Sequence, residues 1–121
     1  SWIMESIVTN TPYKIGGNVL NTHLIDNLST DACVEVPCLV DNQGIHPCHV
    51  GALPLQLAAM NSSNIYPQLL TIEAARTKRK DAVYQAAMMD PHTGGELSLD
   101  DIVSMCDELL EAHKDWLPVY H

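Results

Sequence analysis

Residues 32–50 carry the strongest secondary-structure signal in the chain and read ACVEVPCLVDNQGIHPCHV. Residues 32–40 are rich in β-branched and apolar side chains, residues 41–44 have the composition of a turn, and the residues after them run back in the same style. Two such runs joined by a short turn predict a β-hairpin. Pro37 and Pro47 have no amide hydrogen to donate, so each must point its nitrogen away from the ladder or lie at a bulge.

The residues before the hairpin predict a short helix and an extended segment. Residues 2–9 place apolar side chains near one helical face, and Asn10-Thr11-Pro12 ends the helix. Residues 13–24 are predicted to be extended, with a break at Gly16-Gly17-Asn18. Paired glycines inside a strand mark a bulge or a close approach of backbone or ligand.

The chain becomes helical from Leu53 onward, where apolar residues recur at helical spacing. Pro54 suits the first position of a helix. We expect Asn61-Ser62-Ser63-Asn64 and Pro67 to interrupt or kink this helix before it resumes and reaches a basic cluster at residues 76–80. Because cations favour helix C-termini, the cluster indicates a solvated helix end.

Two further helices are predicted near the C-terminus. Asp81–Met89 forms the first, and Thr93-Gly94-Gly95 is expected to be a loop. Ser98 with Asp101 three residues later resembles a capping box, and apolar residues then recur at helical spacing until Pro118 ends the helix. The predicted fold class is therefore α+β, with antiparallel strands and a hairpin packed with helices.

Composition limits the class of protein. The chain has 121 residues, 46% of them hydrophobic and 17% charged, which is typical of one globular domain. No stretch is apolar enough to cross a bilayer, and residues 1–5 lack the basic region and apolar core of a signal peptide. We therefore expect a cytoplasmic protein, or a fragment whose targeting information lies elsewhere.

The charge is negative and unevenly distributed. The net charge is −9, made up of −4 over residues 1–60, +1 over residues 61–90 and −6 over residues 91–121. So acidic a chain repels nucleic-acid phosphates and anionic lipid, so we expect neither as a partner.

Four cysteines stand at positions 33, 38, 48 and 106. An even count permits disulfides, but a chain of this size holds a core without them and nothing signals secretion. Reduced, buried thiols are the favoured interpretation.

Cys38, His46, Cys48 and His49 are the nearest approach to a metal site. Thiolates and imidazoles suit zinc or another transition metal. However, no C-x-x-C pair is present, and neighbours along a strand point to opposite faces, so Cys48 and His49 cannot both reach one ion without distortion. We expect no metal site built wholly from this chain.

Catalytic motifs are missing from the sequence. Glu35 is a single carboxylate in a β-rich run, whereas the two-carboxylate glycosidases need a second acid opposite the first. An outward-facing strand position is the expected role of Glu35. The sequence also contains no G-x-G-x-x-G, P-loop or G-x-S-x-G motif.

A long collinear set of sequence blocks resembles the C-terminal region of glycoside hydrolase family 4, and within it the α-galactosidase branch. The blocks cover nearly the whole chain and are Gly17-Asn18-Val19, Asn21, Ile25, Asn27-Leu28, Val34-Glu35-Val36-Pro37-Cys38, Gly44-Ile45-His46-Pro47, Val50-Gly51, Leu53-Pro54, Thr71-Ile72-Glu73-Ala74-Ala75, Tyr84-Gln85-Ala86-Ala87-Met88, Asp90-Pro91-His92-Thr93, Leu97-Ser98-Leu99-Asp100 and Asp107-Glu108-Leu109-Leu110-Glu111-Ala112-His113.

The resemblance implies a fold and a chemistry. The family folds like lactate and malate dehydrogenases, so residues 1–121 would be part of the C-terminal domain and the N-terminal dinucleotide-binding domain would lie outside this chain. Its members cleave glycosides by oxidation and elimination with NAD and a divalent metal, usually Mn²⁺, instead of paired carboxylates. The nucleotide loop, the metal ligands and the catalytic acid and base of the family all lie outside this chain, so no catalytic, cofactor-binding or metal-binding residue is expected here.

Two asparagines are the candidates for contact with a sugar. Asn18 and Asn21 lie beside paired glycines that permit close approach, and their amides offer both donors and acceptors to hydroxyls. A structural role in a turn is the alternative for both. His23 stands where the family tends to have Gly, and Pro67 lies in a segment that usually lacks proline. We therefore expect His23 to alter a loop near the sugar, and so to affect which substrate is accepted.

The sequence supports two functional hypotheses. In the first, the chain is a C-terminal segment of an α-galactosidase-like enzyme, inactive when isolated, whose partners are the missing N-terminal domain, the sugar substrate and further copies in a homo-oligomer. In the second, it is a free-standing, non-enzymatic oligomerisation or sugar-binding module. The sequence does not separate galactosides from glucosides, uronides or 6-phosphoglycosides.

Overall fold

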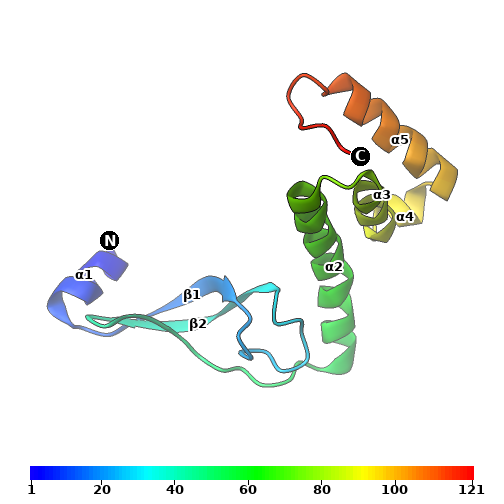
Figure 1. The fold of residues 1–121 in the computed structure, drawn as a ribbon. Coiled ribbons are helices and arrows are strands. Elements are labelled where there is room, and N and C mark those ends of the chain that lie inside the picture. The colour runs from blue at the N-terminus through cyan, green and yellow to red at the C-terminus, as the bar shows by residue number, and fades with distance from the viewer. The chain divides into compact units, whose positions relative to one another are not determined.

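The computed structural model describes all 121 residues, which form two compact units, residues 1–58 and residues 59–121 (Figure 1). In chain order the elements are α1 (Trp2–Thr9), β1 (Tyr13–Leu20), β2 (Cys33–Asp41), β3 (Gly44–Pro47), α2 (Leu55–Thr77), α3 (Lys80–Met89), α4 (Thr93–Glu96) and α5 (Leu99–Ala112). The α+β class and the antiparallel strands predicted from the sequence are confirmed. No helix is at once long enough and apolar enough to cross a membrane.

The first unit is built on a three-stranded antiparallel sheet in the order β1-β2-β3. β1 pairs with β2 from Tyr13 opposite Val40 to Leu20 opposite Cys33. β2 and β3 form the predicted hairpin, in which Asp41 lies opposite Gly44. Gly44 has φ 121°, a conformation open to glycine and strained for other residues, so the turn fixes the register of the hairpin.

Gly16 and Gly17 do not form a bulge, because every residue of β1 pairs with one residue of β2. A Cβ atom on Gly16 would lie 2.8 Å from Glu35 Oε1, and one on Gly17 would lie 2.7 Å from Cys38 Sγ. Both distances are shorter than real Cβ contacts allow. The glycines therefore make room for side chains of the neighbouring strand, whereas the sequence predicted a bulge or a close approach of backbone or ligand.

Pro37 lies in the central strand without breaking the β1–β2 ladder. Its carbonyl oxygen accepts a hydrogen bond from the Cys48 amide at 2.8 Å. The nitrogen and carbonyl of a strand residue point to the same side, so the Pro37 nitrogen also faces away from β1. The amide hydrogen that Pro37 lacks would thus have faced Cys48, one residue beyond Pro47, where β3 ends.

Side chains alternate strictly along β2. Val34, Val36, Cys38 and Val40 are buried, whereas the residues between them are exposed. This alternation is typical of an antiparallel sheet with one covered and one open face. The buried face, together with Ile25, Leu28, Ala32 and Ala58, forms the core of the first unit.

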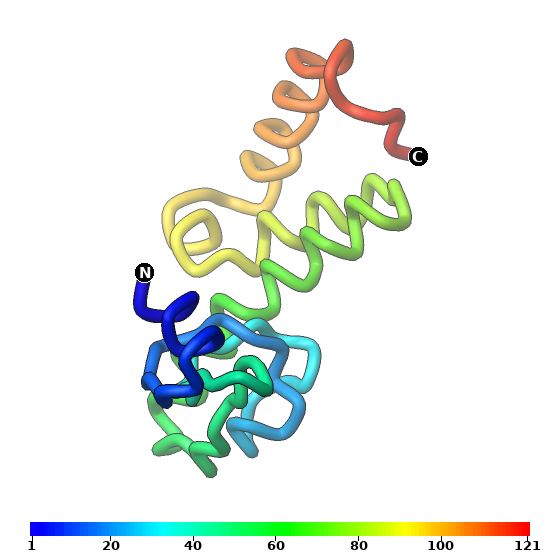
Figure 2. The backbone as a smooth tube through the Cα atoms, turned by 90° about the vertical axis from the view of Figure 1, so that its left-hand side faces the viewer, coloured from blue at the N-terminus to red at the C-terminus, as the bar shows by residue number.

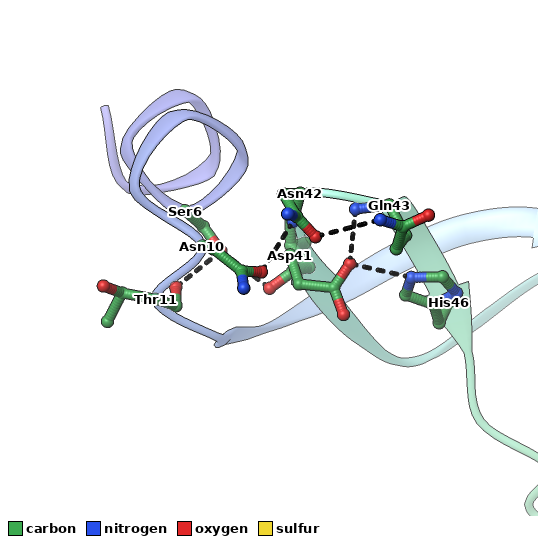
Figure 3. A network of polar contacts seen from close by, with 8 residues as sticks. Ser6, Asn10, Thr11, Asp41, Asn42, Gln43 and His46 are labelled. Atoms are coloured by element: carbon green, nitrogen blue, oxygen red, sulfur yellow. Dashed lines mark hydrogen bonds and ion pairs between the residues drawn. The ribbon is translucent and has the colours of Figure 1, made fainter.

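Helix α1 is fixed to the sheet by one buried residue, Ser6. The Ser6 hydroxyl lies 2.7 Å from the Thr11 carbonyl oxygen and 2.6 Å from the Val40 carbonyl oxygen (Figure 3). Trp2 stacks on Tyr13 with ring centroids 5.7 Å apart. The other apolar side chains of α1 are largely exposed; Met4, for example, is 67% exposed.

The second unit is helical and is closed by the C-terminal tail. The α2–α3 turn contains Lys78 at φ 58°, and the Lys78 amide bonds the Ala74 carbonyl at 2.8 Å, a left-handed cap. The tail returns to this turn, where the His121 amide donates to Lys78 O and the Lys80 amide donates to His121 O (Figure 2). The basic residues of this region therefore lie at helix ends, as predicted.

The capped C-terminal helix is confirmed as α5. Ser98 Oγ accepts a hydrogen bond from the Asp101 amide at 3.2 Å and donates to the Asp101 carboxylate at 2.6 Å. Ile102 and Cys106 of α5 are buried with Ala82 of α3. The helix ends at Ala112, six residues before Pro118, so proline does not terminate it.

Two further predictions about the helices, an interruption of α2 and a loop at residues 93–95, were wrong. Helix α2 runs without interruption from Leu55 to Thr77 with Pro67 inside it. Pro67 removes only one backbone N–H donor from the helix. Its carbonyl oxygen also accepts a hydrogen bond from Thr71 Oγ1 at 2.8 Å. Thr93-Gly94-Gly95 is not a loop but part of α4, because Asp90 Oδ2 accepts bonds from both the amide and the hydroxyl of Thr93 at 2.8 Å.

Candidate functional site

A polar loop follows β1 and is organised by Asn21. The Asn21 side chain is fully buried. Its Nδ2 lies 3.0–3.1 Å from the carbonyl oxygens of Ile25, Leu28 and Ser29, and its Oδ1 accepts from the amides of Leu24 and Ile25 at 3.1 and 2.8 Å. Every donor and acceptor of this amide is engaged with backbone. The structure therefore favours the structural alternative for Asn21.

A second asparagine fastens the same loop to the segment after β3. Asn27 Nδ2 donates to Leu53 O at 2.8 Å, and Asn27 Oδ1 accepts from the Leu53 amide at 2.9 Å. A bridge between Ile25 and Gly51 lies beside this pair. Sequence reasoning assigned no role to Asn27, because the pairing depends on a residue 26 positions away.

Asn18 lies on the open face of the sheet. It is exposed and stands opposite Glu35 in the β1–β2 register. The Glu35 carboxylate crosses Gly16, beside a shallow depression of about 350 Å³ that Lys14 also lines. An exposed amide next to an exposed carboxylate can hydrogen-bond hydroxyls of a ligand, and the outward position predicted for Glu35 is confirmed. Contact between Asn18 and a sugar stays a prediction.

His23 occupies the turn between Asn21 and the rest of the loop. Its backbone has φ 61°, and its side chain is exposed. The left-handed region costs a residue with a Cβ atom about 1 kcal/mol or more, which glycine avoids. The backbone at this position is therefore of the kind that glycine fits best.

The cysteine and histidine cluster of the hairpin does not come together. His46 shares its pairing position with Leu39 and hence lies on the open face, whereas Cys38 is buried on the other face. His46 Nε2 instead lies 3.0 Å from Asp41 Oδ1, and His49 Nε2 lies 2.8 Å from Asp26 Oδ1. No group of three His, Cys, Asp or Glu side chains anywhere in the chain is placed to hold a metal ion.

The cysteines are all free thiols, but only two fit the predicted environment. Cys38 and Cys106 are buried, whereas Cys33 and Cys48 are exposed. Burial raises the pKa of the Cys106 thiol, with a smaller contribution from the Asp107 charge. The interpretation of all four as buried was therefore wrong for Cys33 and Cys48.

The Asp41 carboxylate is the hydrogen-bond acceptor at the centre of the hairpin turn. Its Oδ1 accepts the Gln43 amide at 2.7 Å, and His46 lies on the same oxygen (Figure 3). The Gln43 hydrogen bond, followed by the one from His46, lowers the pKa of Asp41. These contacts organise the turn.

The second unit carries a feature that the sequence did not reveal. A cleft of about 690 Å³ lies between α2, α3, α5 and the tail. Alanine pairs at 74–75 and 86–87 line it, and this repetition of small residues is the one signal in the sequence that points to it. Outside the cleft, Lys80 Nζ and Tyr84 Oη both reach Asp107 Oδ1, at 2.6 and 2.5 Å, and tie α3 to α5.

Comparison with known proteins identifies relatives over the whole chain. The chain is 61% identical over 120 residues to an α-galactosidase of Bacillus subtilis (strain 168), and 34% identical over 120 residues to an α-galactosidase of Rhizobium meliloti (strain 1021). Each alignment covers 99% of this chain, but only 28% and 24% of the relative. The chain thus spans about a quarter of the length of these relatives.

Solved structures of glycosidases have the same fold. A 6-phospho-α-glucosidase from gut microorganisms, in complex with NAD and glucose-6-phosphate, matches with a TM-score of 0.85 at 27% identity, over 99% of this chain and 26% of its own. A 6-phospho-α-glucosidase in complex with NAD and Mn²⁺ matches with a TM-score of 0.86 at 19% identity, over 99% of this chain and 27% of its own.

A family model agrees with these relatives. The model described as the family 4 glycosyl hydrolase C-terminal domain matches residues 1–93. With a model covering most of the chain and a relative of 61% identity, the chain belongs to glycosyl hydrolase family 4 and corresponds to its C-terminal domain.

Proposed function

We propose that residues 1–121 are the C-terminal domain portion of a glycosidase that hydrolyses α-galactosides. The observation that carries this proposal is the 61% identity to an α-galactosidase over 99% of the chain. Identity to a maltose-6′-phosphate glucosidase is only 31%. Because substrate specificity depends on particular side chains, the relative with twice the identity is the better guide to the sugar.

The cofactors of the proposed enzyme bind outside these residues. Related proteins crystallise with NAD and Mn²⁺, which supports both cofactors for the complete protein. The residues described here do not fit either group, since no three potential ligands converge and no glycine-rich nucleotide motif is present. We therefore expect the nucleotide-binding domain and the metal ligands to belong to another part of the polypeptide, and the isolated chain to be inactive.

The contribution of this chain to the sugar site is the open face of its sheet. Asn18 is exposed there beside Glu35, so its amide is free to bind hydroxyls. Asn21 acts indirectly, because its amide is occupied by the loop that follows β1. This loop presents His23, whose exposed ring makes the loop a second determinant of the sugar.

Location and assembly follow from the same proposal. Exposed Cys33 and Cys48 persist as thiols in a reducing compartment, and NAD-dependent chemistry fits the cytoplasm. Exposed apolar side chains on α1, including Val8 at 83% exposure, are expected to be covered by the missing domain or by a second subunit.

The test uses the complete protein that contains these residues. We expect it to hydrolyse p-nitrophenyl α-galactoside with NAD⁺ and Mn²⁺, to lose activity with EDTA, and to hydrolyse the β-anomer and p-nitrophenyl 6-phospho-α-glucoside at least tenfold more slowly. Faster turnover of the phosphorylated sugar would instead assign the enzyme to the 6-phosphoglycosidases of the family. Turnover by the isolated 121-residue chain, or a coding sequence that starts at Ser1, would favour the free-standing module instead.

The role of Asn18 has its own test. Asn18→Ala should raise KM for the galactoside about fivefold, which corresponds to the loss of one hydrogen bond of about 1 kcal/mol, and should leave Tm unchanged. Gln43→Ala, which removes an exposed amide at the hairpin turn, is the matched control. A lowered Tm with unchanged KM would assign Asn18 a structural role.

A further inference from the structure

The cleft of the second unit has three helical walls. The cleft is lined by Ala74–Ala75 of α2, Ala86–Ala87 of α3 and Leu109–Leu110 of α5, together with Tyr120 of the tail. Its volume is about 690 Å³. Leu109 is 50% exposed although it lines the cleft, so the walls present apolar surface that this chain does not cover.

Some polar side chains of the cleft are engaged within the chain, and Gln68, His113 and Tyr120 line it as well. Asp90 Oδ2 accepts two hydrogen bonds from Thr93, and Thr71 Oγ1 donates to the Pro67 carbonyl. No buried side-chain nitrogen or oxygen in the chain lacks a partner. Most of the residues that line the cleft are apolar, so apolar surface and shape dominate the recognition of its occupant.

The composition of the walls suits a helix. Short alanine side chains on two of the walls allow the backbone of an incoming element to approach, and its large side chains then fill the space that the alanines leave. Helices pack with their axes about 8–10 Å apart, which requires small residues on one side of the contact where large ones stand on the other.

We propose that an amphipathic helix from the same polypeptide, outside residues 1–121, fills this cleft in the complete protein. This inference rests on the proposed function, under which the chain is one part of a longer enzyme. Relatives support it, because this chain spans only 28% of the B. subtilis α-galactosidase and most of that polypeptide remains to supply the helix.

The charge near the cleft favours a helix with basic residues, and it disfavours a second copy of this chain as the occupant. Residues 91–121, which form α4, α5 and the tail, carry a net charge of −6. A symmetric contact between two copies would place this acidic segment against itself, which like-charge repulsion disfavours. The helix that binds should therefore carry apolar residues at positions i, i+3, i+4 and i+7, with Lys or Arg at the edges of that stripe.

Photo-crosslinking in the complete protein tests the proposal. p-Benzoylphenylalanine replaces Leu109 in the cleft and, as a control, Gln85, which is exposed on α3 and does not line the cleft. After irradiation we expect the Leu109 site to join one peptide outside residues 1–121 within the same chain, and the Gln85 site to give less than a tenth of that product. Gln68, an exposed residue that also lines the cleft, replaces Leu109 if that variant does not fold.

The other outcomes overturn the proposal. A product of twice the monomer mass identifies a second copy as the occupant, and a folded protein with no crosslink identifies an open cleft. A coding sequence that begins at Ser1 also overturns it. The crosslink requires no turnover, so a protein that gives the expected crosslink but hydrolyses no glycoside refutes the proposed function alone.

A packing variant gives an independent readout. Ala86→Trp places a large side chain in the cleft, whereas the neighbouring Gln85→Trp lies outside it. If a helix fills the cleft, Ala86→Trp should lower Tm of the complete protein by at least 5 °C and Gln85→Trp should not. An unchanged or raised Tm for Ala86→Trp means that the cleft is empty.

Discussion

Each of the two units of the chain is stabilised internally, and the kind of interaction differs between them. In residues 1–58, polar side chains donate to the backbone of other segments: Asn21 and Ser6 do so from buried positions and Asn27 from an exposed one. In residues 59–121, apolar helix faces meet around Ile102 and Ala82, and the polar contacts between helices involve exposed groups such as Lys80 and Asp107. A unit rich in irregular backbone needs particular polar residues, because its amides and carbonyls are not satisfied by helices.

The comparison predicts that a single polar deletion is most damaging in the first unit. Asn21→Ala should lower the free energy of unfolding by about 4 kcal/mol, because several buried backbone groups lose their partner at about 1–3 kcal/mol each. Chemical denaturation followed by circular dichroism measures the change. Asn18→Ala is the control, since it removes an exposed amide three residues earlier and should change the free energy by less than about 0.5 kcal/mol. Equal effects of the two variants would contradict the structural role of Asn21.

The second unit should instead be most sensitive to an apolar deletion. Ile102 is completely buried in α5, and Ile102→Ala should cost about 3 kcal/mol through lost burial and the cavity left behind. Val103→Ala, at the half-buried neighbouring position, should cost about 1 kcal/mol and serves as the control. Thermal unfolding measures both variants, and a cost for Ile102→Ala no larger than that of its neighbour would argue against a core centred on α5.

The predictability of the two units from sequence differs for the same reason. The strand at residues 32–40, the turn at 41–44 and the Ser98 cap were all predicted, because each depends on neighbouring residues. The role of Asn21 was left open, because its burial depends on a loop that folds around it. The continuity of α2 through Pro67 was missed, because packing of the flanking turns outweighs the loss of one hydrogen bond.

The site was predicted less well than the fold. Exposed Asn18 and outward Glu35 follow from strand alternation, so their common face was accessible from the sequence. The cleft beside α5 was not, because it arises where three helices that are separate in sequence diverge. Conversely, the hairpin histidines suggested a ligand cluster only until their register placed His46 and Cys38 on opposite faces.

Backbone strain offers a smaller test with one position in each unit. His23 has φ 61° and Lys78 has φ 58°, and both are residues with a Cβ atom. His23→Gly and Lys78→Gly should each stabilise the chain by about 0.5 kcal/mol, the relief of strain less the added entropy of the unfolded chain. His23→Ala and Lys78→Ala are the controls and should give no gain. A loss of stability in His23→Gly alone would mean that the His23 ring makes a contact that outweighs the strain.

The smallest expected effect is a pH dependence at α4. Hydrogen bonds from the amide and then the hydroxyl of Thr93 lower the pKa of Asp90 below 3.8. Because the folded pKa is lower than the unfolded one, this contribution is present above about pH 4 and is lost as the pH falls through the folded pKa. The Thr93 amide resonance in NMR spectra should therefore titrate with a midpoint below 3.8. Asp90→Asn retains an acceptor oxygen without a titrating group, so the same resonance should lose its pH dependence. A midpoint at or above the ordinary value would show that Asp90 does not cap this turn.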